Sequence, residues 1–301
     1  GLVLAFDQYN SKGTMLEEKI GAIEGSKIKE IYSKGSMGNL FYYEDELHAV
    51  GMRKRFDWPT NTTFLKISNT GNVSYKYRSF DRNIVKAEVN EAILYFLYED
   101  SGKTLLRDGT NNVDLINSDV TIKDFAFNNE QTFVIANSFS NPDEIYELNN
   151  GQLTKISKAN ESFTKKVKTW DCEYERIDTG KSEIDTWGIF VGKDNPTILN
   201  IHGGPASQYA FTFFDEFQTY ASAGFNVIAC NPRGSSGRGH DFLRDVCGNK
   251  WGVTDMHDVL TSFKSMKKIM GITNKNDGIM GGSYGGFMTS WIISHHPNMF
   301  K

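Results

Sequence analysis

Residues 280–286 read Met-Gly-Gly-Ser-Tyr-Gly-Gly, a G-x-S-x-G pattern with Ser283 at its centre. The short apolar run at 277–280 predicts a buried strand, and residues 287–293 predict a buried helix. A strand, a glycine-flanked turn and a helix together are typical of a nucleophile elbow. The glycines fit this role because the serine must adopt a strained backbone conformation, which neighbours without a Cβ tolerate. The pattern predicts Ser283 as a nucleophile; the alternative is a glycine-rich turn with a capping serine.

A second glycine-rich loop lies earlier in the chain. Residues 197–201 predict a buried strand that runs into His-Gly-Gly-Pro at 202–205. A hydrolase with a serine elbow needs two N–H donors aimed at the developing oxyanion. We expect one from the residue after the nucleophile, Tyr284, and the other from Gly204, where the backbone must approach the substrate closely. The alternative is a turn that binds no ligand.

Helix and strand patterns alternate after residue 196. They are an aromatic-rich helix near 213–220, a strand at 225–230, a loop at 231–237, a short helix at 240–246 and an amphipathic helix at 252–270. Two strands near 172–177 and 184–191 precede them, after a lysine-rich linker or short helix at 158–169. The alternation predicts a parallel sheet with helices on both faces over residues 161–301.

The first half of the chain, residues 1–160, shows only short strand patterns separated by turn signals. A weak repeat at 63–75, 93–115 and 132–156 recurs about every 40 residues, the size of a four-stranded propeller blade. We therefore expect an all-β, partial β-propeller with about four blades, the first incomplete. A β-sandwich stays open as the alternative. His48 and Trp58 stand out here, but we interpret both as packing or surface residues.

The composition excludes several classes of function. The chain has 301 residues, 39% of them hydrophobic and 23% charged, as in ordinary globular proteins. The net charge of -4, without a long basic run, argues against nucleic-acid binding, and no apolar run has membrane-spanning length. The three cysteines, Cys172, Cys230 and Cys247, suggest neither a disulfide framework nor a zinc site. We expect no metal and a reducing, cytoplasmic compartment.

Several phrases of this sequence occur together in one known family. They are residues 199–205, 231–237 and 281–287, Trp251-Gly252 with Asp255 and Asp258, and residues 138–146. Together they resemble the prolyl oligopeptidase family of serine peptidases, most closely its acylaminoacyl-peptidase branch. The resemblance implies a seven-bladed propeller that caps an α/β-hydrolase domain. It also implies an active site between the two domains, cleavage of short peptides, and no metal or organic cofactor.

The sequence departs from this family in one respect. The triad of α/β-hydrolases runs in the order Ser, Asp, His. Residues 284–301 contain no Asp or Glu, and His295 and His296 lie on the predicted elbow helix, which leads away from the serine. The resemblance therefore implies a triad Asp and His beyond residue 301, and an interior segment of a longer enzyme. We expect this segment to be inactive alone and to be covered by the remaining segments of the same protein or by self-association.

Three interpretations of function stay open at this point. The first is a serine peptidase that acts on short peptides. The second is a carboxylesterase with an accessory β domain, and the third is a non-catalytic propeller binding module on an inactive hydrolase scaffold. The β repeats and the loop at 231–237 favour the peptidase, and an intact Ser283 argues against the binding module.

Overall fold

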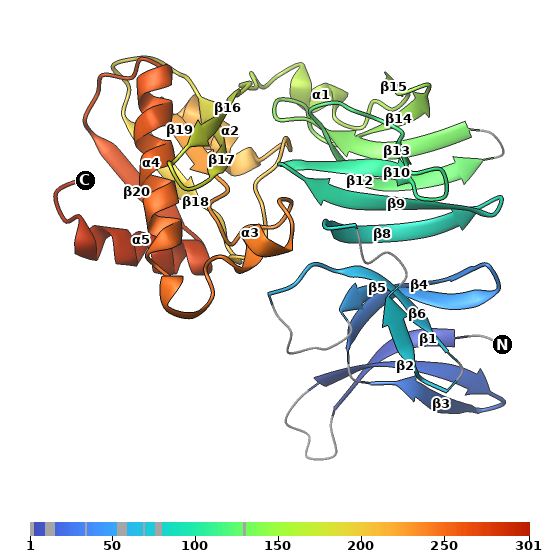
Figure 1. Cartoon of the computed structure of the whole chain (residues 1–301). Helices are drawn as coiled ribbons and strands as arrows, with labels where there is room; N and C mark the ends of the chain where they lie inside the picture. Colours follow the sequence, from blue (N-terminus) through green and yellow to red (C-terminus); the bar gives the residue numbers. More distant parts are fainter. Residues whose placement is uncertain are drawn as a thin grey trace. The chain divides into compact units, whose positions relative to one another are not determined.

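The computed structural model describes residues 3–9, 16–33, 35–52, 59–68, 70–75, 80–128 and 131–301 (Figure 1). Trp58 lies outside these ranges. The chain separates into two compact units, which are described one at a time. Unit 1 consists of residues 1–99 and 106–116, and unit 2 consists of residues 100–105 and 117–301.

Unit 1 begins with two antiparallel sheets in which each strand pairs with the next along the chain. The second sheet has four strands, the number in a propeller blade. His48 is fully buried in it and stacks on Phe41, with ring centroids 5.5 Å apart, so it is a packing residue as predicted. The strands are β1 (Val3–Tyr9), β2 (Leu16–Glu24), β3 (Lys27–Tyr32), β4 (Ser36–Tyr43), β5 (Glu46–Met52), β6 (Thr63–Ile67) and β7 (Val73–Tyr75).

Two further sets of four strands follow, and consecutive strands pair within each set. The predicted repeat at 93–115 and 132–156 corresponds to the last three strands of each set. A single parallel pair, Thr104 with Thr121, joins the two sets. The strands are β8 (Asn83–Asn90), β9 (Ile93–Asp100), β10 (Lys103–Asp108), β11 (Val113–Asp114), β12 (Thr121–Asn128), β13 (Gln131–Asn137), β14 (Glu144–Asn149) and β15 (Gln152–Lys155).

The second half of unit 2 is built on a five-stranded sheet with the order β16-β17-β19-β18-β20. Strands β19, β18 and β20 are parallel, as the alternating pattern predicts. The hairpin β16-β17 adds two antiparallel strands beside β19, so the whole sheet is mixed. The strands are β16 (Glu173–Asp178), β17 (Glu183–Ile189), β18 (Thr197–Ile201), β19 (Asn226–Cys230) and β20 (Asp277–Gly281).

Helices cover both faces of this sheet, as predicted (Figure 1). Because neighbouring side chains of a strand point to opposite faces, β19 supplies Ile228 to one core and Val227 to the other. The first core is closed by α4 and α5, and the second by α2. The helices are α1 (Glu161–Thr164), α2 (Asp215–Ser222), α3 (His240–Arg244), the 3₁₀ turn η1 (Gly248–Lys250), α4 (Thr254–Ile269) and α5 (Tyr284–His295).

The strand order determines where a site can form. The chain passes from β18 through α2 to β19 on one side, and then returns through α4 to β20 on the other side of β18. Ligands of open α/β sheets bind at such a reversal, beyond the carboxyl ends of the strands. The loop that follows β18 starts at His202, and the turn that follows β20 holds Ser283. Both predicted motifs therefore lie at the reversal point.

In the described ranges, none of the helices combines the length and the apolar character that a membrane crossing requires.

Candidate active site

Ser283 lies between the end of β20 and the start of α5, in the conformation expected of an elbow serine. Its backbone has φ 55° and ψ −119°, a region that residues with a Cβ rarely adopt. The turn is closed on both sides, because the Gly285 N–H donates to Gly282 O (2.8 Å) and the Phe287 N–H donates to Ser283 O (3.1 Å). The surrounding hydrogen bonds therefore hold the strain at the serine.

The glycines on either side of Ser283 allow the elbow to pack against β18. A Cβ on Gly281 would lie 2.6 Å from the carbonyl oxygen of Ile201, and a Cβ on Gly285 would lie 2.0 Å from the same oxygen. Both distances are far below van der Waals contact, and the obstacle is the backbone of a central strand. Glycine at these two positions is thus a packing requirement of the elbow.

The loop after β18 passes directly beside the serine. A Cβ on Gly203 would be in ordinary contact with the Ser283 Cβ, at 3.4 Å. The next residue, Gly204, has φ +123°, which favours glycine, and it is exposed. In the described parts of the chain, neither the Gly204 N–H nor the Tyr284 N–H donates to another residue. Tyr284 is the first residue of α5, where backbone N–H groups have no partner within the helix.

His202 connects this loop to the loop at 231–237. The side chain is buried; its Nδ1 lies 2.6 Å from Gly203 O, and its Nε2 lies 3.0 Å from Ser235 Oγ. Burial lowers the pKa of His202, so the ring is neutral near pH 7. Nδ1 thus faces Gly203 O, and Nε2 faces the Ser235 hydroxyl, which itself donates to Pro232 O at 2.7 Å. Because the peptide group is planar, fixing Gly203 O also fixes the direction of the Gly204 N–H.

The side chain of Tyr284 is hydrogen-bonded to a buried carboxyl group on α4. The Tyr284 hydroxyl donates to Asp255 Oδ2 (2.6 Å), and the Trp251 ring meets the Tyr284 ring edge to face at 5.2 Å. Burial raises the pKa of Asp255 and also that of Tyr284. These contacts explain why Trp251 and Asp255 accompany the serine motif: they fix the side chain of the residue that follows Ser283.

Arg233 anchors the loop at 231–237 to α4. Its Nε and Nη2 each donate to the Asp258 carboxylate at 2.8 Å, and its Nη1 donates to Asp245 at 2.9 Å. Asp258 is fully buried and also accepts from the Thr179 hydroxyl. The hydrogen bonds to Asp258 are the main cause of the raised pKa of Arg233. The ion pair thus fixes the loop that carries Ser235, the partner of His202.

Replacing Arg233 by methionine is expected to lower the free energy of unfolding by ~3–5 kcal/mol, because it leaves the Asp258 charge buried and unpaired. The measurement is chemical denaturation of the full-length protein that contains this chain. Lys250 gives a matched control: it also pairs with Asp245 but its side chain is 52% exposed, and Lys250→Met should cost less than about 1 kcal/mol. Equal losses in the two variants would contradict the anchoring role of Arg233.

The histidines near the C-terminal end of the chain do not reach the serine. His295 ends α5, a helix of 12 residues and roughly 18 Å in length, whereas Ser283 precedes its first residue. The His295 Nδ1 lies 2.8 Å from Trp291 O, and its ring packs on the Trp291 ring at 4.2 Å. His257 lies on α4, where its Nδ1 is 3.5 Å from Asp258. No described histidine is hydrogen-bonded to the Ser283 side chain.

A cavity of about 480 Å³ lies beside the elbow and the loop after β18. Gly203 and Gly282 line it on the side of the elbow, and Glu216 lines it on the side of α2. The Glu216 carboxylate accepts from the Tyr220 hydroxyl at 2.5 Å. A concave space with a few fixed polar groups next to a strained serine is the kind of place where a small substrate binds.

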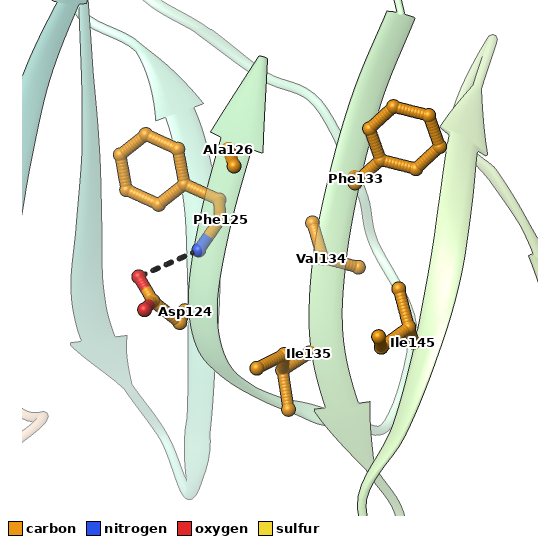
Figure 2. Close-up of a pocket in the computed structure, with 7 residues that line it drawn as sticks. All are labelled: Asp124, Phe125, Ala126, Phe133, Val134, Ile135 and Ile145. Atoms are coloured by element: carbon orange, nitrogen blue, oxygen red, sulfur yellow. Dashed lines mark hydrogen bonds between the residues drawn. The ribbon is translucent and has the colours of Figure 1, made fainter. Parts of the chain in front are cut away.

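A second hollow, of about 330 Å³, lies on strands β12 to β14 and is shown in Figure 2. It is lined mostly by apolar side chains such as Phe133, Ile135 and Ile145. Its one carboxylate, that of Asp124, accepts from the Phe125 N–H at 2.8 Å. This hollow brings together no nucleophile and base. Within the described ranges, no group of three or more His, Cys, Asp or Glu residues could hold a metal ion.

Known families and sequences match parts of this chain. The family model described as the prolyl oligopeptidase family matches residues 211–301. The uncharacterized peptidase YuxL of Bacillus subtilis is 47% identical over 107 residues, which cover 35% of this chain and 16% of that protein. Dipeptidyl-peptidase 5 of Porphyromonas gingivalis is 30% identical over 188 residues, covering 59% of this chain and 27% of that protein.

Solved structures match over nearly the whole chain. The acylaminoacyl peptidase of Pyrococcus horikoshii has a TM-score of 0.83 at 22% identity and covers 99% of this chain, while this chain covers 49% of it. Prolyl endopeptidases match with a TM-score of 0.67 at 10% identity. The chain thus spans about half the length of the solved peptidases that it matches. The fold is a partial β-propeller followed by a partial α/β-hydrolase domain, and the β-sandwich alternative is wrong.

The resemblance read from the sequence motifs is confirmed for residues 211–301, which match the model of the prolyl oligopeptidase family.

Proposed function

We propose that the protein containing this chain is a serine peptidase that hydrolyses short peptides, with Ser283 as its nucleophile. One observation carries the proposal: Ser283 has the strained backbone of an elbow serine and lies beside the glycine loop after β18, close enough that a Cβ on Gly203 would touch its side chain. The similarity to proteins named as peptidases supports it. We also propose that residues 1–160 form the partial β-propeller and that residues 161–301 form the N-terminal part of the α/β-hydrolase domain.

In the proposed reaction, Ser283 Oγ attacks the carbonyl carbon of the scissile peptide bond, and a general base takes the hydroxyl proton. The Gly204 and Tyr284 N–H groups donate to the resulting oxyanion, which stabilises it because both donors are already oriented. The base then returns the proton to the leaving amine, and water hydrolyses the acyl-enzyme. We place the Asp and His of the triad outside this chain. No step calls for a metal or organic cofactor.

The kind of peptide that the protein cleaves is a more specific question than the reaction type. We favour acylaminoacyl or proline-containing peptides, since an acylaminoacyl peptidase and a prolyl endopeptidase share the fold. The test is to assay the full-length protein against acyl-amino-acid amides, proline-containing amides and simple esters. Turnover of esters alone would favour the carboxylesterase, and no turnover of any substrate would favour the binding module.

Residues 1–301 expressed alone are expected to hydrolyse no peptide and to self-associate, because the remaining segments of the same protein, which we propose cover the open edge, are then missing. Without a general base, Ser283 stays a neutral hydroxyl at pH 7. Strand β20 is also the last strand in the sheet order, and an unpaired strand edge favours association. The measurements are peptide hydrolysis and mass in solution. A monodisperse monomer whose activity disappears in Ser283→Ala would contradict this prediction.

We also propose a reducing, cytoplasmic location. All three cysteines are free thiols, and burial raises the pKa of Cys230 to about 12, which keeps that thiol protonated and unreactive. Fractionation of cells that express the full-length protein tests this, and recovery of the protein outside the cytoplasm would contradict it.

A further inference from the structure

We propose that Gln208 is a positioning residue, which clamps the loop of the oxyanion donor Gly204 to the turn between β9 and β10. This inference rests on the proposed peptidase function and adds a residue to it. The turn at residues 100–103 comes from a β hairpin, far in sequence from the hydrolase sheet, yet it belongs to the same compact unit as that sheet. The side chain of Gln208 forms hydrogen bonds to this turn.

The turn has the geometry of a tight two-residue hairpin loop. Ser101 has φ 49° and Gly102 has φ +72°, so both central residues have positive φ, as a type I′ turn requires. Gly102 is buried, and a Cβ there would lie 2.2 Å from the Trp187 ring. The absence of a side chain therefore lets the turn lie against the hydrolase sheet.

The carboxamide of Gln208 pairs with the backbone of this turn at two points. Its Oε1 accepts from the Gly102 N–H at 3.1 Å, and its Nε2 donates to Lys103 O at 3.2 Å. The carboxamide thus satisfies one donor and one acceptor of the turn at once, much as a strand edge would. A hydrophobic side chain of the same length could make neither bond.

Backbone hydrogen bonds surround this clamp and join it to both loops of the site. The Phe211 N–H donates to Gly102 O at 2.7 Å, and the Ser101 N–H donates to Gly237 O at 3.0 Å. The Ser236 N–H in turn donates to Ser207 O at 2.9 Å. The turn therefore contacts the loop at 231–237 and the segment that continues from Gly204, at the point where these two loops meet.

The clamp acts on the reaction through the short segment between Gly204 and Gln208. Only three residues separate the proposed oxyanion donor from the clamped side chain. His202 fixes this segment at its start, and Gln208 fixes it at its end. Gln208 also lines the cavity beside the elbow. Without the Gln208 hydrogen bonds, the C-terminal end of this segment would be less fixed, and the position of the Gly204 N–H would vary. A displacement of about 1 Å at a catalytic group can lower the rate ~100-fold.

The experiment compares Gln208→Met with wild type in the full-length protein. We expect kcat on peptide amides to fall ~10- to 100-fold, with KM within about twofold, because the clamp serves the transition state more than substrate binding. Gln152→Met is the matched control: this glutamine is exposed on β15, and its variant should keep wild-type kcat. A Gln208→Met enzyme with wild-type kcat would overturn the inference.

A second variant, Gln208→Glu, separates positioning from general stability. The carboxylate form cannot donate to Lys103 O, whereas the protonated form can donate to it and still accept from Gly102. The ratio of its kcat to that of wild type should therefore rise as the pH falls from about 6 to about 4, through the ordinary pKa of a glutamate, while the ratio for Gln208→Met stays flat. A flat ratio for Gln208→Glu, with lowered unfolding midpoints in both variants, would indicate a structural role only and overturn the inference.

The two proposals can fail separately. A full-length wild-type protein that hydrolyses no peptide would overturn the proposed function, and this inference with it. An active wild type in which the Gln208 variants match the Gln152 control would overturn the role of Gln208 alone.

Discussion

Substituting alanine for Ser283 is expected to lower kcat of the full-length protein by ~10⁶-fold, to the residual rate that binding and the oxyanion donors alone support. The reason is that Ser283 has a strained backbone at the start of α5 and lies beside the glycine loop that follows β18. A fluorophosphonate probe should label wild type at Ser283 and leave the variant unlabelled. The measurements are steady-state hydrolysis and the mass of the labelled peptide.

Ser294→Ala is the matched control for this experiment. Ser294 lies on α5, is exposed, and its hydroxyl donates to Trp291 O at 2.8 Å, away from the turn that holds Ser283. Its variant should keep both labelling and activity. Labelling that persists in Ser283→Ala would show that another residue is the nucleophile.

Substituting alanine for Gly285 is expected to have the second-largest effect, a loss of about 3 kcal/mol or more in the free energy of unfolding, together with loss of activity. The added Cβ would lie 2.0 Å from Ile201 O and 3.0 Å from His202 O. Neither oxygen can move without displacing β18 or the loop that follows it. The elbow helix must therefore shift, and Ser283 and the Tyr284 N–H shift with it.

Gly282→Ala provides the matched glycine in the same turn. A Cβ at Gly282 would meet no atom within 4 Å, so stability should change by less than about 1 kcal/mol. Chemical denaturation of the two variants of the full-length protein measures the difference. Equal stability of both would show that the elbow does not depend on close packing against β18.

The local elements of the hydrolase half were predictable because each has a local cause. The apolar runs of β18 and β19 and the helical spacing of α4 and α5 lie close to the predicted ranges. The elbow was predictable for the same reason, since its glycines, serine and flanking runs are contiguous in the chain. The repeat of strands and turns likewise predicted the blades and an incomplete first one, and in the described residues the first sheet has three strands, β1 to β3.

Partner choice between distant segments was not predictable. The hairpin β16-β17 joins the sheet beside β19, an antiparallel addition that the alternating pattern does not contain. Arg233 pairs with Asp258, and both are charged residues that a sequence alone would place on the surface. His202 was visible only as part of a glycine-rich motif, and its contact with Ser235 spans two separate loops.

The sequence by itself determined the local structure at one point: a serine in a glycine-flanked turn, preceded by a strand and followed by a helix. These features depend on residues within a few positions of Ser283, where steric limits on the backbone act directly. The tertiary structure alone decided which residues hold that point in place. Gln208 reaches Gly102 across 106 positions of the chain, and Tyr284 reaches Asp255 across 29. Such contacts form only after the sheet and helices have packed and brought distant segments together, because a hydrogen bond requires its two heavy atoms to lie within about 3 Å. The residues next to each partner in the sequence do not reveal which distant residue it will meet.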